Sequence, residues 1–166
     1  MSKKNVSAAS DTETRATSDH TLDIRLWLRM LTCTNLIENH IRSRLRTECG
    51  ITLPRFDLMA QLERFPQGLK MGELSKRMMV TGGNVTGITA QLVAEGLVVR
   101  EGNPKDRRAY IVKFTPEGRN NFDRMAKAHE LWLIELFAGM DEVQHHQLYE
   151  LLAALKSSAT RATRTR

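Results

Sequence analysis

The chain has 166 residues, with 25 Lys plus Arg against 19 Asp plus Glu and a formal net charge of +6. This length fits one domain that buries its own core and is short for a two-domain enzyme. It contains no run of the roughly 20 apolar residues that a membrane helix needs, no secretory h-region and only two cysteines, so we expect a cytoplasmic protein without membrane contact.

The two ends of the chain differ in composition from its middle. Residues 1–21 are rich in Ser, Thr, Asp and Ala, which predicts a disordered arm. Residues 157–166 carry three Arg and no acidic residue, which predicts a mobile basic tail. Between them we expect a single domain over residues 22–156.

Helical periodicity begins at Leu22 and continues to about Cys49, with Gly50 as the stop signal. A helix of this length spans roughly 40 Å, more than a domain of this size covers, so we expect it to pack against a partner. A second helix begins at about residue 52 and stops at Phe65-Pro66. The apolar residues that recur at helical spacing in the first helix are Trp27, Leu31, Ile37, Ile41 and Leu45.

The middle of the chain predicts a helix-turn-helix followed by a β-hairpin. A short helix over 70–77 is joined by residues 78–80 to a helix capped at Thr81 and closed by Gly96. The hydropathy period then changes to two, which indicates a hairpin over 97–114 with a polar tip at 101–108. The stripe predicted to be buried in the second helix consists of Val85, Ile88, Leu92 and Val93.

Two further helices end the domain. Thr115-Pro116 is a strong helix start, and Asp141 with Gln144 forms the pattern of a capping box for the final helix. The predicted fold class is mainly α with one small β-wing. The final helix is predicted to bury Leu148, Leu151, Leu152 and Leu155.

A helix-turn-helix followed by a basic hairpin is the winged-helix arrangement, in which one helix enters the major groove of DNA. The second helix has three glycines in its first two turns, each of which disfavours a helix by about 1 kcal/mol but permits a close approach to DNA. Its amide side chains suit adenine edges. The alternative is a loosely capped surface helix. The predicted contacts on this helix are Thr81, Gly82, Gly83, Asn84, Thr86 and Gln91.

Basic residues flank this helix on both sides. We expect Lys70, Lys76 and Arg77 to bind phosphates. On the hairpin, an arginine beside a carboxylate can enter a narrow minor groove, although a solvated charged turn is the ordinary alternative. The predicted contacts of the hairpin are Lys105, Asp106, Arg107 and Arg108.

Residues 97–118 resemble the wing signature of MarR-type regulators, an Asp-x-Arg on the wing followed by a strand that ends in Leu-Thr-x-x-Gly. Phe114 replaces the usual Leu, and Asn103 and Lys105 stand where many members have a further Asp and Arg. The matching residues are Asp106, Arg108, Thr115 and Gly118.

The resemblance implies a bacterial winged-helix homodimer that represses transcription from a palindromic operator on double-stranded DNA until a small effector releases it. It implies a DNA-binding lobe at about 51–114, with residues 22–50 and 115–156 forming the dimer.

The stretches 26–33 and 53–61 resemble a subgroup that controls the catabolism of aromatic acids. This likeness implies an effector such as a benzoate-, hydroxycinnamate- or lignin-derived acid or its CoA thioester, and no cofactor. An arginine or histidine beside flat apolar side chains suits an aromatic carboxylate, and Arg55 is the first choice because a cation gains nothing at the start of a helix. The candidate ligand-binding residues are Trp27, Arg29, Cys33, His40, Arg55, Phe56, Met59, His129 and Trp132.

Each of these residues also has a plainer interpretation, since aromatic and Met side chains at helical spacing are usually core. Two other signals stay open: a redox response through Cys33, and a metal response through His129 with the pair His145-His146. A helical carrier of small molecules is the alternative outside transcription. The chain shows no nucleophile–base–acid set, phosphate loop or metal spacing, so we do not expect an enzyme.

Overall fold

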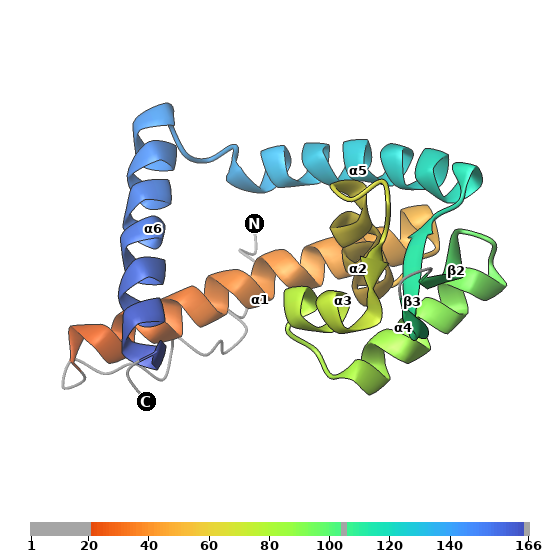
Figure 1. The fold of residues 1–166 in the computed structure, drawn as a ribbon. Helices are drawn as coiled ribbons and strands as arrows, with labels where there is room; N and C mark the ends of the chain where they lie inside the picture. Colours follow the sequence, from red (N-terminus) through yellow and green to blue (C-terminus); the bar gives the residue numbers. More distant parts are fainter. Residues whose placement is uncertain (1–20, 104–105, 165–166) are drawn as a thin grey trace, which may run out of the picture. The chain divides into compact units, whose positions relative to one another are not determined.

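The computed structural model describes residues 21–103 and 106–164, without the side chains of 103 and 106–109. The described chain is mainly helical with a small antiparallel sheet (Figure 1), which confirms the predicted fold class. Its elements are α1 (Leu22–Cys49), α2 (Leu53–Glu63), β1 (Leu69–Lys70), α3 (Met71–Met78), α4 (Gly82–Ala94), β2 (Val98–Asn103), β3 (Asp106–Phe114), α5 (Pro116–Phe137) and α6 (Glu142–Arg164).

The described chain divides into two compact parts, one ending at His129 and the other beginning at Glu130. The predicted arm falls on residues 1–20, outside the described residues, and the predicted domain bounds stay a prediction. No helix in the part of the chain described here has the length and apolarity needed to cross a bilayer.

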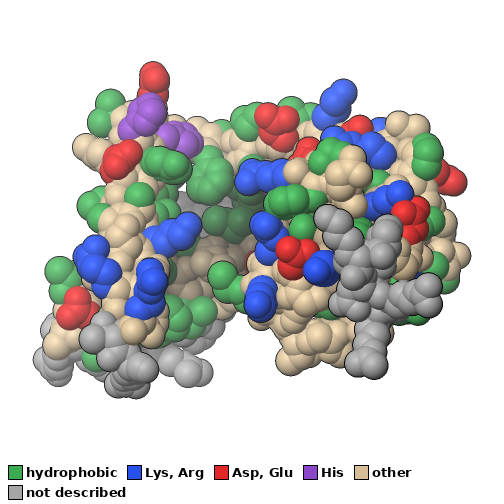
Figure 2. Space-filling view, viewed as in Figure 1, with side chains coloured by type: hydrophobic (Ala, Val, Ile, Leu, Met, Phe, Trp, Pro, Cys, Tyr) green, Lys and Arg blue, Asp and Glu red, His purple; other side chains and the backbone are tan. Residues whose placement is uncertain are grey.

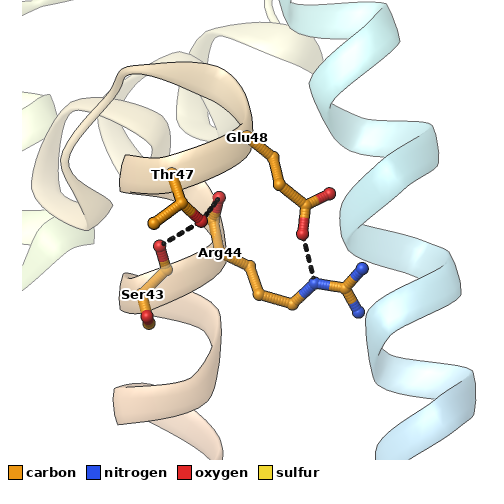
Figure 3. Close-up of polar contacts among 4 residues, drawn as sticks. All are labelled: Ser43, Arg44, Thr47 and Glu48. Carbon is orange, nitrogen blue, oxygen red and sulfur yellow. Dashed lines mark hydrogen bonds and ion pairs between the residues drawn. The ribbon is translucent and has the colours of Figure 1, made fainter.

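Helix α1 has the predicted bounds and ends in a left-handed cap at Gly50 (φ 66°). In its second half the apolar stripe buries Ile41 and Leu45, while Ile37 is half-buried. On the exposed side Arg44 Nε donates to Glu48 at 2.6 Å, one turn further on (Figure 3). In the first half Trp27 is 58% exposed and Thr32 is the one buried residue, so the single chain leaves this part of the apolar stripe uncovered.

In the core of the first part, α2, α3 and α4 pack on one another and on the sheet, and α1 packs on α2. The strand order of the sheet is β1-β3-β2. Strand β1 was not predicted: Leu69 pairs with Val112 and Lys70 with Ile111. Gly68 (φ 83°) makes this pairing possible, because a Cβ there would lie 2.5 Å from the Val112 carbonyl. The largest fully buried side chains are Phe122, Leu45, Leu58, Met59, Leu62, Leu74, Leu92, Val85, Val98, Val112 and Thr89.

The buried stripe of α4 differs from the prediction at two positions. Ile88 is half-buried and Val93 is 39% exposed, whereas Thr89 is fully buried. Thr89 lies four residues after Val85 and three before Leu92, so all three share one face, while Val93 is turned about 100° from Leu92. The helical period, more than hydropathy, decides which side chain is buried.

The junction between the hairpin and α5 is held by Thr115. Its N–H donates to the Leu97 carbonyl at 3.1 Å, and its hydroxyl donates to the Gly96 carbonyl at 2.7 Å. The same hydroxyl oxygen accepts from the Gly118 N–H at 2.9 Å, which caps the helix as predicted. A Cβ on Gly118 would lie 1.7 Å from the Leu97 oxygen, so only glycine fits there.

In the second part, α6 begins with the predicted capping box: Gln144 N–H donates to Asp141 Oδ1 at 2.8 Å, and Asp141 N–H to Gln144 Oε1 at 3.0 Å. The prediction that α6 buries its leucines is wrong for the single chain, in which no residue of this helix is buried. The exposed leucines are Leu148, Leu151, Leu152 and Leu155.

The predicted mobile tail is also wrong as far as Arg164, where α6 ends. The segment 157–164 has neither Gly nor Pro, and its Ala and Arg residues favour a helix. The basic residues still mark this end: Figure 2 shows Lys and Arg side chains around the C-terminal half of α6, and those described are Lys156, Arg161 and Arg164. Residues 165–166 lie outside the described residues.

Candidate nucleic-acid interface

The turn between α3 and α4 is fixed by hydrogen bonds and by a shared apolar core. Ser75 Oγ donates to the Val80 carbonyl at 2.6 Å, and the Val80 N–H donates to the Ser75 carbonyl at 3.2 Å. Leu74 of α3 and Val85 of α4 are fully buried where the two helices pack. The predicted helix-turn-helix is therefore present, with β2 and β3 following α4 directly (Figure 1).

Helix α4 is capped as predicted, since the Asn84 N–H donates to Thr81 Oγ1 at 3.4 Å. Thr86 Oγ1 donates to the Gly82 carbonyl at 2.9 Å, which leaves its methyl group and oxygen lone pairs for a partner. All six side chains or glycines predicted to meet DNA on this helix are exposed. They are Thr81, Gly82, Gly83, Asn84, Thr86 and Gln91.

The glycines of α4 are not required by the packing of the protein itself. A Cβ on Gly82, Gly83 or Gly87 would meet no atom within 4 Å. These positions therefore accept a side chain, and alanine would make a more stable helix. Gly118 is the opposite case, because there the fold leaves no room for a Cβ. Because these glycines have no side chain, a molecule outside the described chain can approach the backbone of α4 closely.

Exposed cations flank α4. Lys70 and Lys76 are exposed, and the guanidinium of Arg77 lies 4.3 Å from the centre of the Phe65 ring, which holds it in place on the surface. The sequence from Leu74 to Ala94 contains no acidic residue. This surface is therefore suited to a polyanion.

The wing is a hairpin whose strands run further than predicted, from Val98 to Asn103 and from Asp106 to Phe114. Backbone pairing continues through the charged sequence, with a register shift between Gly102 and Asn103. Arg100 lies over the Tyr110 ring at 4.7 Å. The predicted tip contacts fall outside the described side chains: Lys105, Asp106, Arg107 and Arg108.

Comparison with known proteins identifies this arrangement. A family model described as the MarR family matches residues 50–109. The crystal structure of a MarR family transcriptional regulator from Silicibacter pomeroyi is 33% identical, with a TM-score of 0.72 over 82% of this chain and 94% of that one. The chain belongs to the MarR family. It is a transcriptional regulator with a winged-helix fold, and not an enzyme, as the sequence predicts.

Two other transcriptional regulators are similar to this chain, one over a shorter alignment and one at lower identity. The HTH-type transcriptional regulator YkoM of Bacillus subtilis is 33% identical over 89 residues, which cover 54% of this chain and 56% of that protein. The transcriptional activatory protein BadR of Rhodopseudomonas palustris is 27% identical over 129 residues, covering 76% of this chain and 71% of BadR.

The structure of this MarR-family protein brings together only some of the predicted ligand residues. Phe56 and His129 are in ring contact, with centroids 4.9 Å apart, and Phe56 also contacts Phe122 at 5.5 Å. Burial lowers the pKa of His129. Met59 is fully buried core, and Trp132 belongs to the second part, where it is 2% exposed. The predicted residues of α1 are exposed: Trp27, Arg29, Cys33 and His40.

Arg55, the first choice for an anion, already has a carboxylate partner. Its Nη2 pairs with Glu95 at the C-cap of α4, so the cation at the start of α2 ties the two helices together. The side chain is only 12% exposed, and burial lowers its pKa. Within the described residues its buried Nε has no hydrogen-bond partner, which leaves one donor for a water or ligand.

The redox and metal alternatives gain no supporting contact. Cys33 is exposed. Burial, and after it the charge of Glu48, raises the pKa of the Cys49 thiol, so a smaller fraction of this thiol is ionised. Among the residues described, no three or more His, Cys, Asp or Glu side chains gather as metal ligands do.

Proposed function

We propose that this MarR-family regulator binds specific duplex DNA by placing α4 in the major groove. The observation that carries the proposal is the exposed surface of α4, where glycines that the fold does not require lie beside amide and hydroxyl groups. Asn84 and Gln91 can form paired hydrogen bonds with adenine, and the Thr86 methyl can contact thymine. Lys70, Lys76 and Arg77 then bind phosphates on either side.

We infer that the wing contacts the same duplex. A hairpin beside α4 reaches the backbone or minor groove, where an arginine with a carboxylate neighbour is well suited to a narrow groove. The sequence supports Arg107 or Arg108 in this role, with Lys105 and Asp106 next to them.

The acting form is proposed to be a homodimer on a palindromic operator. Each part of the chain carries apolar side chains that the single chain leaves exposed, and such surfaces mark association sites. A two-fold dimer presents two copies of α4, so that its operator repeats in inverted orientation. The exposed apolar residues include Leu22, Ile24, Leu26, Trp27 and Leu36 of α1 and Val143, Leu148, Leu151, Leu152 and Leu155 of α6.

For the signal, we propose an aromatic carboxylate or its CoA thioester. The half-buried ring of His129 lies against the buried Phe56 ring, and the buried Nε of Arg55 has no hydrogen-bond partner among the described residues; these features support an anion that carries an aromatic ring. Binding would release the operator and so end repression. BadR is named an activatory protein, so the sign of regulation needs its own measurement, a promoter fusion assayed with and without the protein.

The DNA proposal is tested by selecting a duplex from a random pool with the purified protein and titrating it at several salt concentrations. Asn84→Ala should weaken binding about tenfold or more, and Arg108→Ala should weaken it and lower the salt dependence. Arg164→Ala, at the end of α6, is the matched control and should bind like the wild type. Failure to select any duplex, or equal binding by the Asn84 variant, would contradict the proposal.

The effector proposal is tested by thermal shift with benzoate, hydroxycinnamates and their CoA thioesters, with free CoA as the control. A compound that raises Tm should also release the selected duplex, and Phe56→Leu should weaken both effects. Stabilisation by free CoA alone, or by no aromatic acid, would refute the aromatic effector and leave the DNA proposal standing.

A further inference from the structure

Met79 occupies an unusual backbone position in the turn between α3 and α4. It has φ 55° and is the one non-glycine residue with positive φ among those described. Its side chain is 92% exposed, the highest value among the exposed large apolar residues of the described chain. An apolar side chain with almost no internal contact therefore holds a conformation that glycine adopts more readily.

The turn does not need this side chain. The hydrogen bonds that close it come from the Met79 and Val80 N–H groups and from Ser75 Oγ, and none involves the Met79 thioether. Glycine would make the same backbone bonds without the strain of a left-handed L residue. What favours methionine here must therefore lie outside the described chain.

The surroundings indicate the chemistry of that partner. Lys76 and Arg77 are exposed in the turn of α3 that precedes Met79, and α4 begins three residues after it with the exposed Gly82 and Gly83. Because no acidic residue occurs between Leu74 and Ala94, this surface attracts a polyanion. It is also continuous with the surface of α4 proposed to read bases.

We propose that Met79 is a further DNA contact, packing its thioether on deoxyribose carbons or a thymine methyl at the groove edge where α4 enters. The inference rests on the proposed DNA binding and adds a specificity element to it. Methionine is unbranched and polarisable, so it adapts to an irregular apolar surface, and thymine methyls are the apolar feature of the major groove. The contact is apolar, so it should contribute affinity that does not depend on salt.

The experiment compares Met79→Gly, Met79→Asn and Met79→Leu on the duplex selected by the wild type, at four salt concentrations. Gly and Asn both accept positive φ, so they keep the turn and remove the apolar contact. We expect both to bind about tenfold more weakly with an unchanged salt slope, and Met79→Leu to stay within about threefold of wild type. Lys76→Ala is the matched control, which should lower the salt slope by about 0.9.

Thermal melts and sedimentation of the same variants complete the test. Met79→Gly should have a Tm equal to or above that of the wild type and the same mass in solution. Wild-type affinity in the Gly and Asn variants would overturn the proposed contact. A loss of affinity accompanied by a lower Tm would also overturn it. A changed mass in solution would overturn it as well, and would indicate that Met79 contacts a second copy of the chain. If the wild type selects no duplex at all, the proposed function fails and this contact with it.

Discussion

Gly118→Ala is the sharpest test of the packing between α5 and the base of the wing. Helix propensity alone favours the substitution, because alanine stabilises a helix by about 1 kcal/mol relative to glycine. The structure predicts the opposite sign. The new Cβ would lie 1.7 Å from the Leu97 carbonyl oxygen, about 1.3 Å closer than the 3.0 Å below which such contacts essentially do not occur. The start of α5 must therefore move away from Leu97.

That movement has a calculable effect on stability. It strains the two hydrogen bonds from Thr115 to the Leu97 and Gly96 carbonyls, worth about 1 kcal/mol each, and overpacking adds about 1–3 kcal/mol. After the gain in propensity, we expect a net loss of about 2–4 kcal/mol. For a chain of this size the corresponding fall in Tm is about 4–16 °C.

Urea unfolding followed by circular dichroism measures the difference. All variants are compared at one protein concentration, because the stability of the proposed dimer depends on concentration. Gly87→Ala is the matched control: its Cβ would meet nothing within 4 Å, so it should raise stability by about 0.5–1 kcal/mol. If Gly118→Ala is as stable as the wild type, or if the two variants rank in the reverse order, the packing argument fails.

Three other experiments test local electrostatics. Burial raises the pKa of Asp57, with Glu38 adding to this effect and Arg42 opposing it. Above that pKa the ionised carboxylate destabilises the folded state, so Asp57→Asn should raise Tm at pH 7 but not at pH 3. Burial lowers the pKa of His129, so the unfolded chain takes up the proton first and stability falls as pH drops below about 6.5; His129→Gln should flatten a series of Tm values from pH 7.5 to 5, and an unchanged slope would contradict this. Glu95→Ala strands the guanidinium of Arg55 and should lower the urea midpoint more than Arg55→Met, which removes the buried cation; equal midpoints would argue against the pair.

The elements that follow from local signals could be predicted from the sequence. Gly50 ends α1, Thr81 caps α4, and Asp141 with Gln144 starts α6, all as expected. Each of these depends on residues within one turn of the helix end, so a single stretch of sequence contains the whole cause. The sequence also indicated the helix start at Thr115, but the structure was needed to show the hydrogen bonds from Thr115 to Leu97 and Gly96.

Features that depend on distant partners could not be predicted. Strand β1 exists because Leu69 meets Val112, more than forty residues away, and two residues carry no periodicity of their own. Arg55 was singled out by its position, but its partner Glu95 lies on another helix. The left-handed conformation of Met79 has no sequence signal, since methionine is not a turn residue. For the exposed leucines of α6, a second chain has to be considered before burial can be judged.

The bonds around Thr115 also decide where this protein can be divided. Gly96 closes α4, Leu97 leads into β2, and Gly118 lies in the first turn of α5, and one threonine connects all three. A chimera that joins residues 51–114 of this chain to the α5 and α6 helices of another family member would separate these groups. The two backbones at the joint would then lack the hydrogen bonds that Thr115 makes here. Fusions that keep residues 51–118 as one block retain the contacts that Thr115 makes between α4, β2 and α5.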